Sequence, residues 1–180
     1  MGTCAIFADD NIRLLEQGLE LLRSLSDDAY VRSSHPEYTS GVGGHLRHCL
    51  DHYTNFLDGV AVGKVDYDAR QRDARIESDR FYASSIMERI ITGLRALRES
   101  DATNFVTIKM DGGDDSDTDN WWSPSSAQRE LQFLLSHTVH HYALVSLILR
   151  AQGISLAPGF GVAPSTIRYQ QNMESVAGVR

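Results

Sequence analysis

Apolar residues recur every three or four positions in four long stretches of the chain, which is the spacing of one face of an α-helix. Glycine, proline and charged residues fill the segments between them. Asp9 or Asp10 can cap the first helix. Ser125 or Ser126 can cap the last, and Gly153 follows it as a typical C′ residue. The pattern predicts helices at about residues 9–25, 44–59, 80–99 and 125–152.

A short β-hairpin is expected before the last helix. Residues 104–110 partly alternate and are rich in β-branched side chains, which is typical of a strand. An acidic, turn-rich segment follows, and Trp121 and Trp122 are expected to pair back on this strand. The charged connection 63–80 shows no clear pattern. Residues 154–169 contain two prolines and two glycines, so we expect an extended or turned tail that packs on the helices or on a second copy of the chain.

Helices dominate the pattern, and the alternation of strands and helices that is typical of parallel sheets is missing. We therefore expect an all-α fold, an antiparallel four-helix bundle with a small β-hairpin inserted before the last helix. A chain of 180 residues, 42% hydrophobic and 23% charged, suits a single domain. That domain would span residues 1–180, with the bundle at about 8–152 and a tail at 153–180.

Composition restricts the partners and the location. The net charge of −7, from 17 Lys and Arg against 24 Asp and Glu, argues against a nucleic-acid partner, because phosphate contacts need clustered basic residues. No apolar run approaches the ~18 residues of a membrane span, so no membrane partner is expected. The first residues also lack the basic and apolar regions of a signal peptide. Cys4 and Cys49 are too few for a disulfide framework, which favours a reducing, cytoplasmic location.

Six of the seven histidines fall in two short runs, and both runs lie on predicted helices. His137 and His141 are four residues apart, so their rings lie about 40° apart on one helix face. Leucine and valine share that face, which therefore points into the bundle. By this spacing one helix offers two imidazoles to a single cation. The other run offers His45, His48 and His52 on a broad face of the second helix.

Three imidazoles from two helices suit a borderline divalent cation such as Zn²⁺ or Ni²⁺, with Fe or Mn as alternatives. Three protein ligands leave a coordination position for water or substrate, which is typical of catalytic sites. A hydrogen-bonded core histidine is the competing interpretation of each residue taken singly. A second histidine cluster on another helix favours the metal. His140 is rotated about 60° from His137, to the side away from His141, and ranks below these two histidines.

At these residues the chain resembles the DinB/YfiT-like family of metalloenzymes. The matching features are a histidine of the second helix, in LRHCLDHY, and an HxxxH motif of the last helix, in HTVHH. The order of the helices and the long crossover after the second also match, over about residues 8–152. The resemblance implies an up-down-down-up bundle whose metal is held by His48, His137 and His141. It also implies a homodimer, and relatives that include thiol-dependent transferases and isomerases.

Several further residues are candidates for the same site. Glu130, two turns before His137, could orient a ligand imidazole, or it could be an exposed first-turn glutamate. Arg70 and Arg72 could bind a substrate carboxylate or phosphate, although a solvated charged face is the simpler interpretation. Candidate additional ligands or neighbours of the ligands are His45, His52, His140 and Cys49.

The expected function is therefore a metal-dependent enzyme that activates a water or a thiol for hydrolysis or group transfer. Its partners would be a small-molecule substrate or a thiol cosubstrate. A non-catalytic metal-binding or dimerisation module is the alternative, and a closed four-ligand site using Cys49 or His52 would favour it. A third hypothesis keeps the bundle and treats the histidines as a polar core network without metal.

Overall fold

The computed structural model describes residues 3–33, 40–69, 71–99, 105–110 and 122–177. This part of the chain is mostly helical and carries a small sheet. The helices are α1 (Thr3–Ser24), α2 (Asp27–Val31), α3 (Val42–Val60), α4 (Arg75–Ser78), α5 (Arg80–Glu99), α6 (Ala127–Ala151) and α7 (Pro164–Ala177). The strands are β1 (Lys64–Asp66), β2 (Phe105–Lys109) and β3 (Ser123–Ser126).

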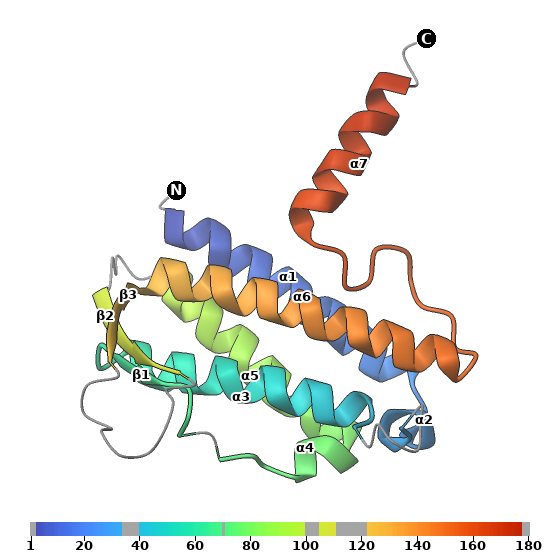
Figure 1. Cartoon of the computed structure of the whole chain (residues 1–180), viewed down its shortest axis with the longest axis horizontal. Helices are drawn as coiled ribbons and strands as arrows, with labels where there is room; N and C mark the ends of the chain where they lie inside the picture. Colours follow the sequence, from blue (N-terminus) through green and yellow to red (C-terminus); the bar gives the residue numbers. More distant parts are fainter. Residues whose placement is uncertain (1–2, 34–39, 70, 100–104, 111–121, 178–180) are drawn as a thin grey trace.

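The long helices α1, α3, α5 and α6 lie side by side around a hydrophobic core (Figure 1). α1 packs against α5 and α6, and α3 packs against the same two helices. Each contributes at least one fully buried leucine, and burying one leucine side chain stabilises the fold by about 1.5–3 kcal/mol. The predicted predominance of helix is confirmed. Examples of these leucines, one from each helix, are Leu15, Leu50, Leu94 and Leu131.

The sheet has three strands in the order β1-β2-β3, so it is larger than the predicted hairpin. β2 forms where the strand was predicted and pairs antiparallel with β3. The partner strand is Ser123–Ser126, whereas the tryptophans were expected to pair there. Trp122 precedes β3, with Lys64 Nζ 4.1 Å from its ring centre, and Trp121 lies outside the described residues. Pro124 is tolerated in β3 because this strand is at the sheet edge.

The connection without a clear pattern contains β1 and α4. Val65, at the centre of β1, pairs in parallel with Ile108 of β2 and is fully buried. A strand of three residues is too short to show periodicity, and its partner lies far along the chain. The sequence of this segment therefore gave no local signal for a strand.

Polar caps fix the first residues of two of the four long helices; the Ser126 cap was predicted from the sequence, and the Asp79 cap was not. The Asp79 carboxylate accepts the backbone N–H groups of Phe81 and Tyr82, so α5 begins at Arg80. The Ser126 hydroxyl accepts the N–H of Arg129 at 3.2 Å and starts α6. After α6, Gly153 adopts φ +78°, the left-handed conformation that glycine allows at low cost.

The predicted start of the first helix is wrong. α1 begins at Thr3, so Asp9 and Asp10 lie inside the helix and do not cap it. Both carboxylates are used on its flanks: Asp9 pairs with Arg98 of α5 at 3.0 Å, and Asp10 pairs with Arg13 one turn later. Acidic residues suit a cap and a salt bridge equally, so the sequence could not separate the two roles.

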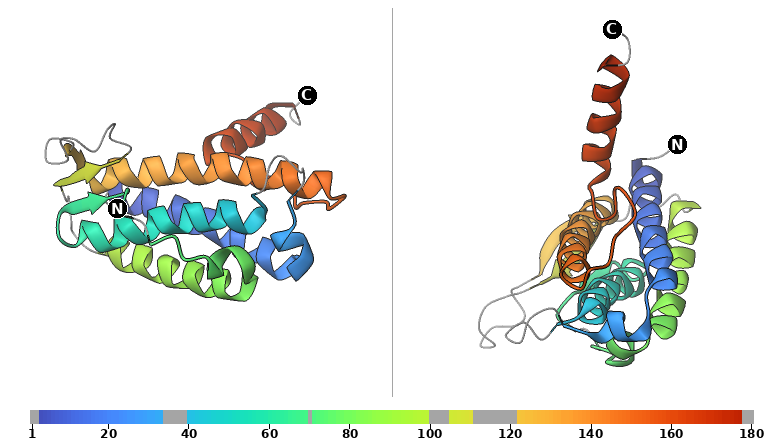
Figure 2. Two further views of the ribbon diagram at one scale, coloured as in Figure 1. Left: turned by 60° about the horizontal axis from the view of Figure 1, so that its bottom comes forward. Right: turned by 90° about the vertical axis from the view of Figure 1, so that its right-hand side faces the viewer.

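The tail is extended only in its first part. Pro164 begins α7, as proline often does at a first helical position, and the prediction of an extended tail to residue 169 is wrong. Before α7, the ring of Phe160 stacks on Tyr142 of α6 at 4.8 Å, and Gly161 lies against the Tyr142 backbone. The tail thus packs on the helices at its start, and α7 then projects away from them (Figure 2).

Among the residues that the structure describes, no helix combines the length and the hydrophobicity needed to cross a lipid bilayer.

Candidate metal centre

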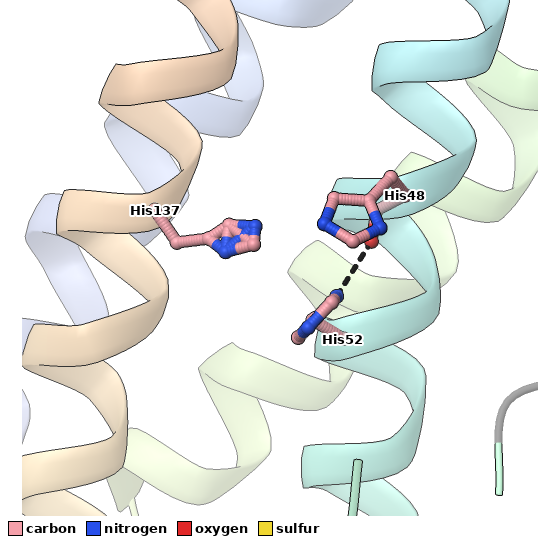
Figure 3. Close-up of side chains that lie close together, drawn as sticks. All are labelled: His48, His52 and His137. Atoms are coloured by element: carbon pink, nitrogen blue, oxygen red, sulfur yellow. Dashed lines mark hydrogen bonds between the residues drawn. The ribbon is translucent and has the colours of Figure 1, made fainter. Parts of the chain in front are cut away.

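Three histidines from two helices point toward one another (Figure 3). His48 and His52 project from α3 and His137 from α6. One ligand nitrogen from each ring can be chosen so that all three lie within 4.8 Å of one another. The ring centres are 4.5 Å apart for His48 and His52, 4.5 Å for His52 and His137, and 4.8 Å for His48 and His137. The structure thus brings together the two helices that carry the histidine runs.

His141 extends this group along α6. Its ring centre is 4.6 Å from that of His137 and 4.7 Å from that of His48. His45 of α3 lies next, with its Nδ1 atom 3.0 Å from Nδ1 of His141. His48 and His137 therefore form a central pair, with the rings of His52 and His141 both close to it; the ligand atoms that converge to within 4.8 Å are those of His48, His52 and His137. The resemblance implies His141 as the third ligand, and the nitrogen distances favour His52.

The donor set fits a transition-metal ion. With Zn–N bonds of about 2.0–2.1 Å, two nitrogens of a tetrahedral site lie about 3.4 Å apart. The widest pair in the triad, at up to 4.8 Å, must therefore close by up to about 1.4 Å, which requires rotation of the histidine side chains when a metal binds. Imidazoles suit Zn²⁺, Ni²⁺ or Fe²⁺, whereas Ca²⁺ and Mg²⁺ prefer oxygen ligands.

The orientation of His52 is fixed by its own helix. Its Nδ1 lies 2.7 Å from the backbone oxygen of His48, one turn earlier. A carbonyl oxygen only accepts, so the ring must donate Nδ1–H. In the neutral ring Nε2 then carries the lone pair and is the atom available to a metal.

Burial keeps two rings of the cluster neutral. It lowers the pKa of His141 to about 3, and the neighbouring histidines, His48 first, act in the same direction. Burial also lowers the pKa of His45, with a smaller contribution from His140. Both rings are therefore uncharged at neutral pH, which is the form that binds a metal ion.

One wall of the cluster is aromatic. The Tyr67 ring, just after β1, stacks on His52 at 5.5 Å and 28°. Phe133 of α6 meets His137 edge-on at 5.4 Å. The Tyr67 hydroxyl donates to Glu130 at 3.0 Å. Burial, followed by the Glu130 charge, raises the pKa of Tyr67 well above its usual range, so the hydroxyl keeps its proton. Tyr67 was not among the residues predicted from the sequence, because it lies in the charged connection without a clear pattern.

Glu130 is fully buried, so its interpretation as an exposed first-turn residue is wrong. Its carboxylate accepts hydrogen bonds from the Tyr67 hydroxyl, the Ser125 hydroxyl and the Arg129 guanidinium. Its hydrogen-bond partners among the described residues include no histidine. Glu130 therefore acts on His52 through Tyr67, whereas the sequence suggested a direct bond to a ligand ring.

A buried polar network lies behind the central pair. The Asn11 amide donates to the backbone oxygen of Leu131, and its oxygen accepts the Tyr53 hydroxyl. Thr138, next to His137, donates to the same hydroxyl at 3.3 Å. These bonds join α1, α3 and α6 at the level of the cluster. They fix how α3 and α6 present their histidines to each other.

The remaining sequence candidates occupy different surroundings. Cys49 is buried, which raises its pKa to about 12, so it remains a protonated thiol at neutral pH and favours the structural interpretation. His140 is exposed, with its ring edge-on to His141 at 5.2 Å. Arg72 is exposed between β1 and α4, and Arg70 lies outside the described residues. Anion binding by these arginines stays a prediction.

A hollow of about 680 Å³ lies between α3, the segment around β1, and α5. Asp58, Lys64, Tyr82 and Arg89 are among its lining residues, and no described histidine lines it. This hollow therefore belongs to a different part of the surface from the cluster.

Comparison with known proteins gives little further information. No family model matches the chain, and no solved structure matches it. The chain is similar to FK506-binding protein 5 of Rhizopus delemar, with 34% identity over 110 residues. The matched region covers 60% of this chain and 28% of that protein. The chain thus spans less than a third of the length of this curated relative.

Proposed function

We propose that the chain is a divalent-metal-dependent enzyme with a DinB-like four-helix bundle. His48 and His137 hold the ion, preferably Zn²⁺ or Ni²⁺, and a third imidazole comes from His141 or His52. The observation that carries the proposal is the convergence of ring nitrogens from α3 and α6 to within 4.8 Å of one another. Histidines that only fill a core have no need to converge from two helices.

The chemistry follows from the number of ligands. An ion held by three imidazoles keeps a position for water or a thiol and lowers the pKa of that group, which supports hydrolysis or group transfer at neutral pH. The chain's own residues orient and shield the site. The backbone of His48 holds the His52 ring, and Tyr67 and Phe133 cover one side with aromatic surface. The Glu130 carboxylate holds Tyr67 in place.

The partners belong to the same proposal. A small-molecule substrate, a low-molecular-weight thiol as cosubstrate, and a homodimer are supported by the resemblance to the DinB/YfiT-like family. The choice between hydrolysis and thiol transfer rests on this resemblance alone.

Calorimetric titration of metal-free protein with Zn²⁺ and Ni²⁺ tests the ligand set. We expect saturation near about one equivalent for a single three-histidine site. His141→Leu and His52→Leu identify the third ligand, because only the variant that lacks it should bind at least about 10-fold more weakly. Unchanged binding in His48→Leu would contradict the proposal.

An activity screen tests the catalytic part. Metal-loaded protein is assayed with activated esters and amides, and with a low-molecular-weight thiol plus an electrophile. Turnover that requires the metal and disappears in His137→Ala supports an enzyme. Stoichiometric metal binding without turnover on either substrate class would favour the non-catalytic module.

A further inference from the structure

The buried ring of His45 makes a contact that the proposed ligand set does not use. Its Nδ1 lies 3.0 Å from Nδ1 of His141, across the interface between α3 and α6. The two ring centres are 5.3 Å apart. His45 is 6% exposed and precedes His48 by one helical turn, yet it is not one of the three histidines whose ligand atoms converge.

The direction of this hydrogen bond decides what His141 can do. A nitrogen–nitrogen distance of 3.0 Å requires one ring to donate and the other to accept. A neutral imidazole carries a single N–H. If His141 donates from Nδ1, its Nε2 has a lone pair and can bind a metal. If His141 accepts at Nδ1, its Nε2 carries the proton and cannot bind one.

His52, which also contacts the central pair of His48 and His137, makes a comparable hydrogen bond through its Nδ1, and the direction of that bond is fixed. His52 must donate from Nδ1, because the atom facing it is the His48 carbonyl oxygen. Its Nε2 is therefore left for a metal. Metal-binding histidines characteristically donate their second N–H to an acceptor, which fixes the tautomer and the ring orientation.

We infer that His45 is a positioning residue of the metal centre: its Nδ1 accepts the Nδ1–H of His141 and leaves Nε2 of His141 as a ligand atom. The inference rests on the proposed function, with His141 as a ligand. A neutral imidazole here takes the place that a carboxylate or a backbone carbonyl takes in other metal sites.

Three variants separate this role from a packing role. His45→Leu fills the space but removes the acceptor, and should weaken Zn²⁺ binding by roughly 10- to 100-fold. His45→Asn places an amide oxygen near the former Nδ1 position and should recover most of that loss. His140→Leu is the matched control, because this exposed ring touches His141 only edge-on, and it should bind Zn²⁺ as the parent does.

The outcomes are distinct. A parent protein that binds no Zn²⁺ overturns the proposed function. A parent that binds, with His45→Leu binding equally well, overturns only the inference about His45. Failure of His45→Asn to recover binding also overturns it, because the ring itself would then be required.

Long-range ¹H–¹⁵N NMR of the histidine rings in the Zn²⁺-loaded parent needs no variant. We expect His141 to carry its proton on Nδ1, with Nε2 shifted by coordination. A proton on Nε2 of His141 would overturn the inference.

Discussion

A hydrogen bond of 3.0 Å from the Tyr67 hydroxyl to the Glu130 carboxylate joins the end of β1 to the first turn of α6. The same tyrosine ring stacks on His52. The small sheet is thereby connected to the wall of the histidine cluster, although the sheet carries no histidine itself.

Tyr67→Phe keeps the aromatic ring and removes this hydrogen bond. The buried carboxylate of Glu130 loses a donor, so we expect the free energy of unfolding to fall by about 1–3 kcal/mol. Urea denaturation of the metal-free protein measures the change. The control is Tyr169→Phe, at an exposed position of α7, which should change the free energy of unfolding by less than about 0.5 kcal/mol. Equal losses in the two variants would show that the Tyr67 hydroxyl has no special role.

Tyr142→Phe should change the free energy of unfolding in the opposite direction to Tyr67→Phe. The Tyr142 hydroxyl is buried and has no hydrogen-bond partner among the described residues. Removing an unsatisfied polar group recovers its desolvation cost, so stability should stay the same or rise by about 1 kcal/mol. A clear loss of stability in urea denaturation would mean that the hydroxyl has a partner.

Gly18 of α1 faces the same hydroxyl. A Cβ atom at Gly18 would lie 2.1 Å from it and 3.0 Å from the end of Met87. Gly18→Ala should therefore destabilise the fold by about 1–3 kcal/mol, despite the better helix propensity of alanine. Combining it with Tyr142→Phe removes the closest clash and should recover part of the loss. A strictly additive double variant would exclude this contact as the cause.

The metal-free protein should lose stability as the pH falls below neutral. The pKa of His141 is about 3 in the folded chain and near 6.5 when the ring is free in water. Between these values the unfolded chain binds the additional proton, so folding is penalised progressively as the pH decreases from 6.5 toward 3. Urea midpoints in a chelator at pH 7.5, 6.5 and 5.5 should decrease in that order. His141→Asn should flatten this dependence, and an unchanged slope would contradict the assignment.

Local patterns predicted much of the framework. The Asp79 cap of α5 was not predicted, but this helix was expected at residues 80–99 and spans Arg80–Glu99, because its apolar periodicity is regular. The two histidine runs were placed on helices for the same reason, and the four-residue spacing put His137 and His141 together. Their ring centres are indeed 4.6 Å apart.

Three of the missed features depend on contacts between distant parts of the chain. β1 exists only because β2 is available to pair with it. The contact between His45 and His141 joins residues 96 positions apart. The burial of Glu130 depends on Tyr67, 63 positions earlier. Spacing along one helix gives the direction of a side chain, but it does not identify the group that meets it from another element.

Metal content of purified, untagged protein tests the central claim most directly. Inductively coupled plasma mass spectrometry should find about one equivalent of a divalent transition metal in the parent and in His140→Ala, as expected for a single three-histidine site. The metal should be lost from both His48→Ala and His137→Ala, because one ligand comes from each helix. A parent with no metal and no uptake on adding Zn²⁺ or Ni²⁺ would contradict the account and leave the histidines as a polar core network.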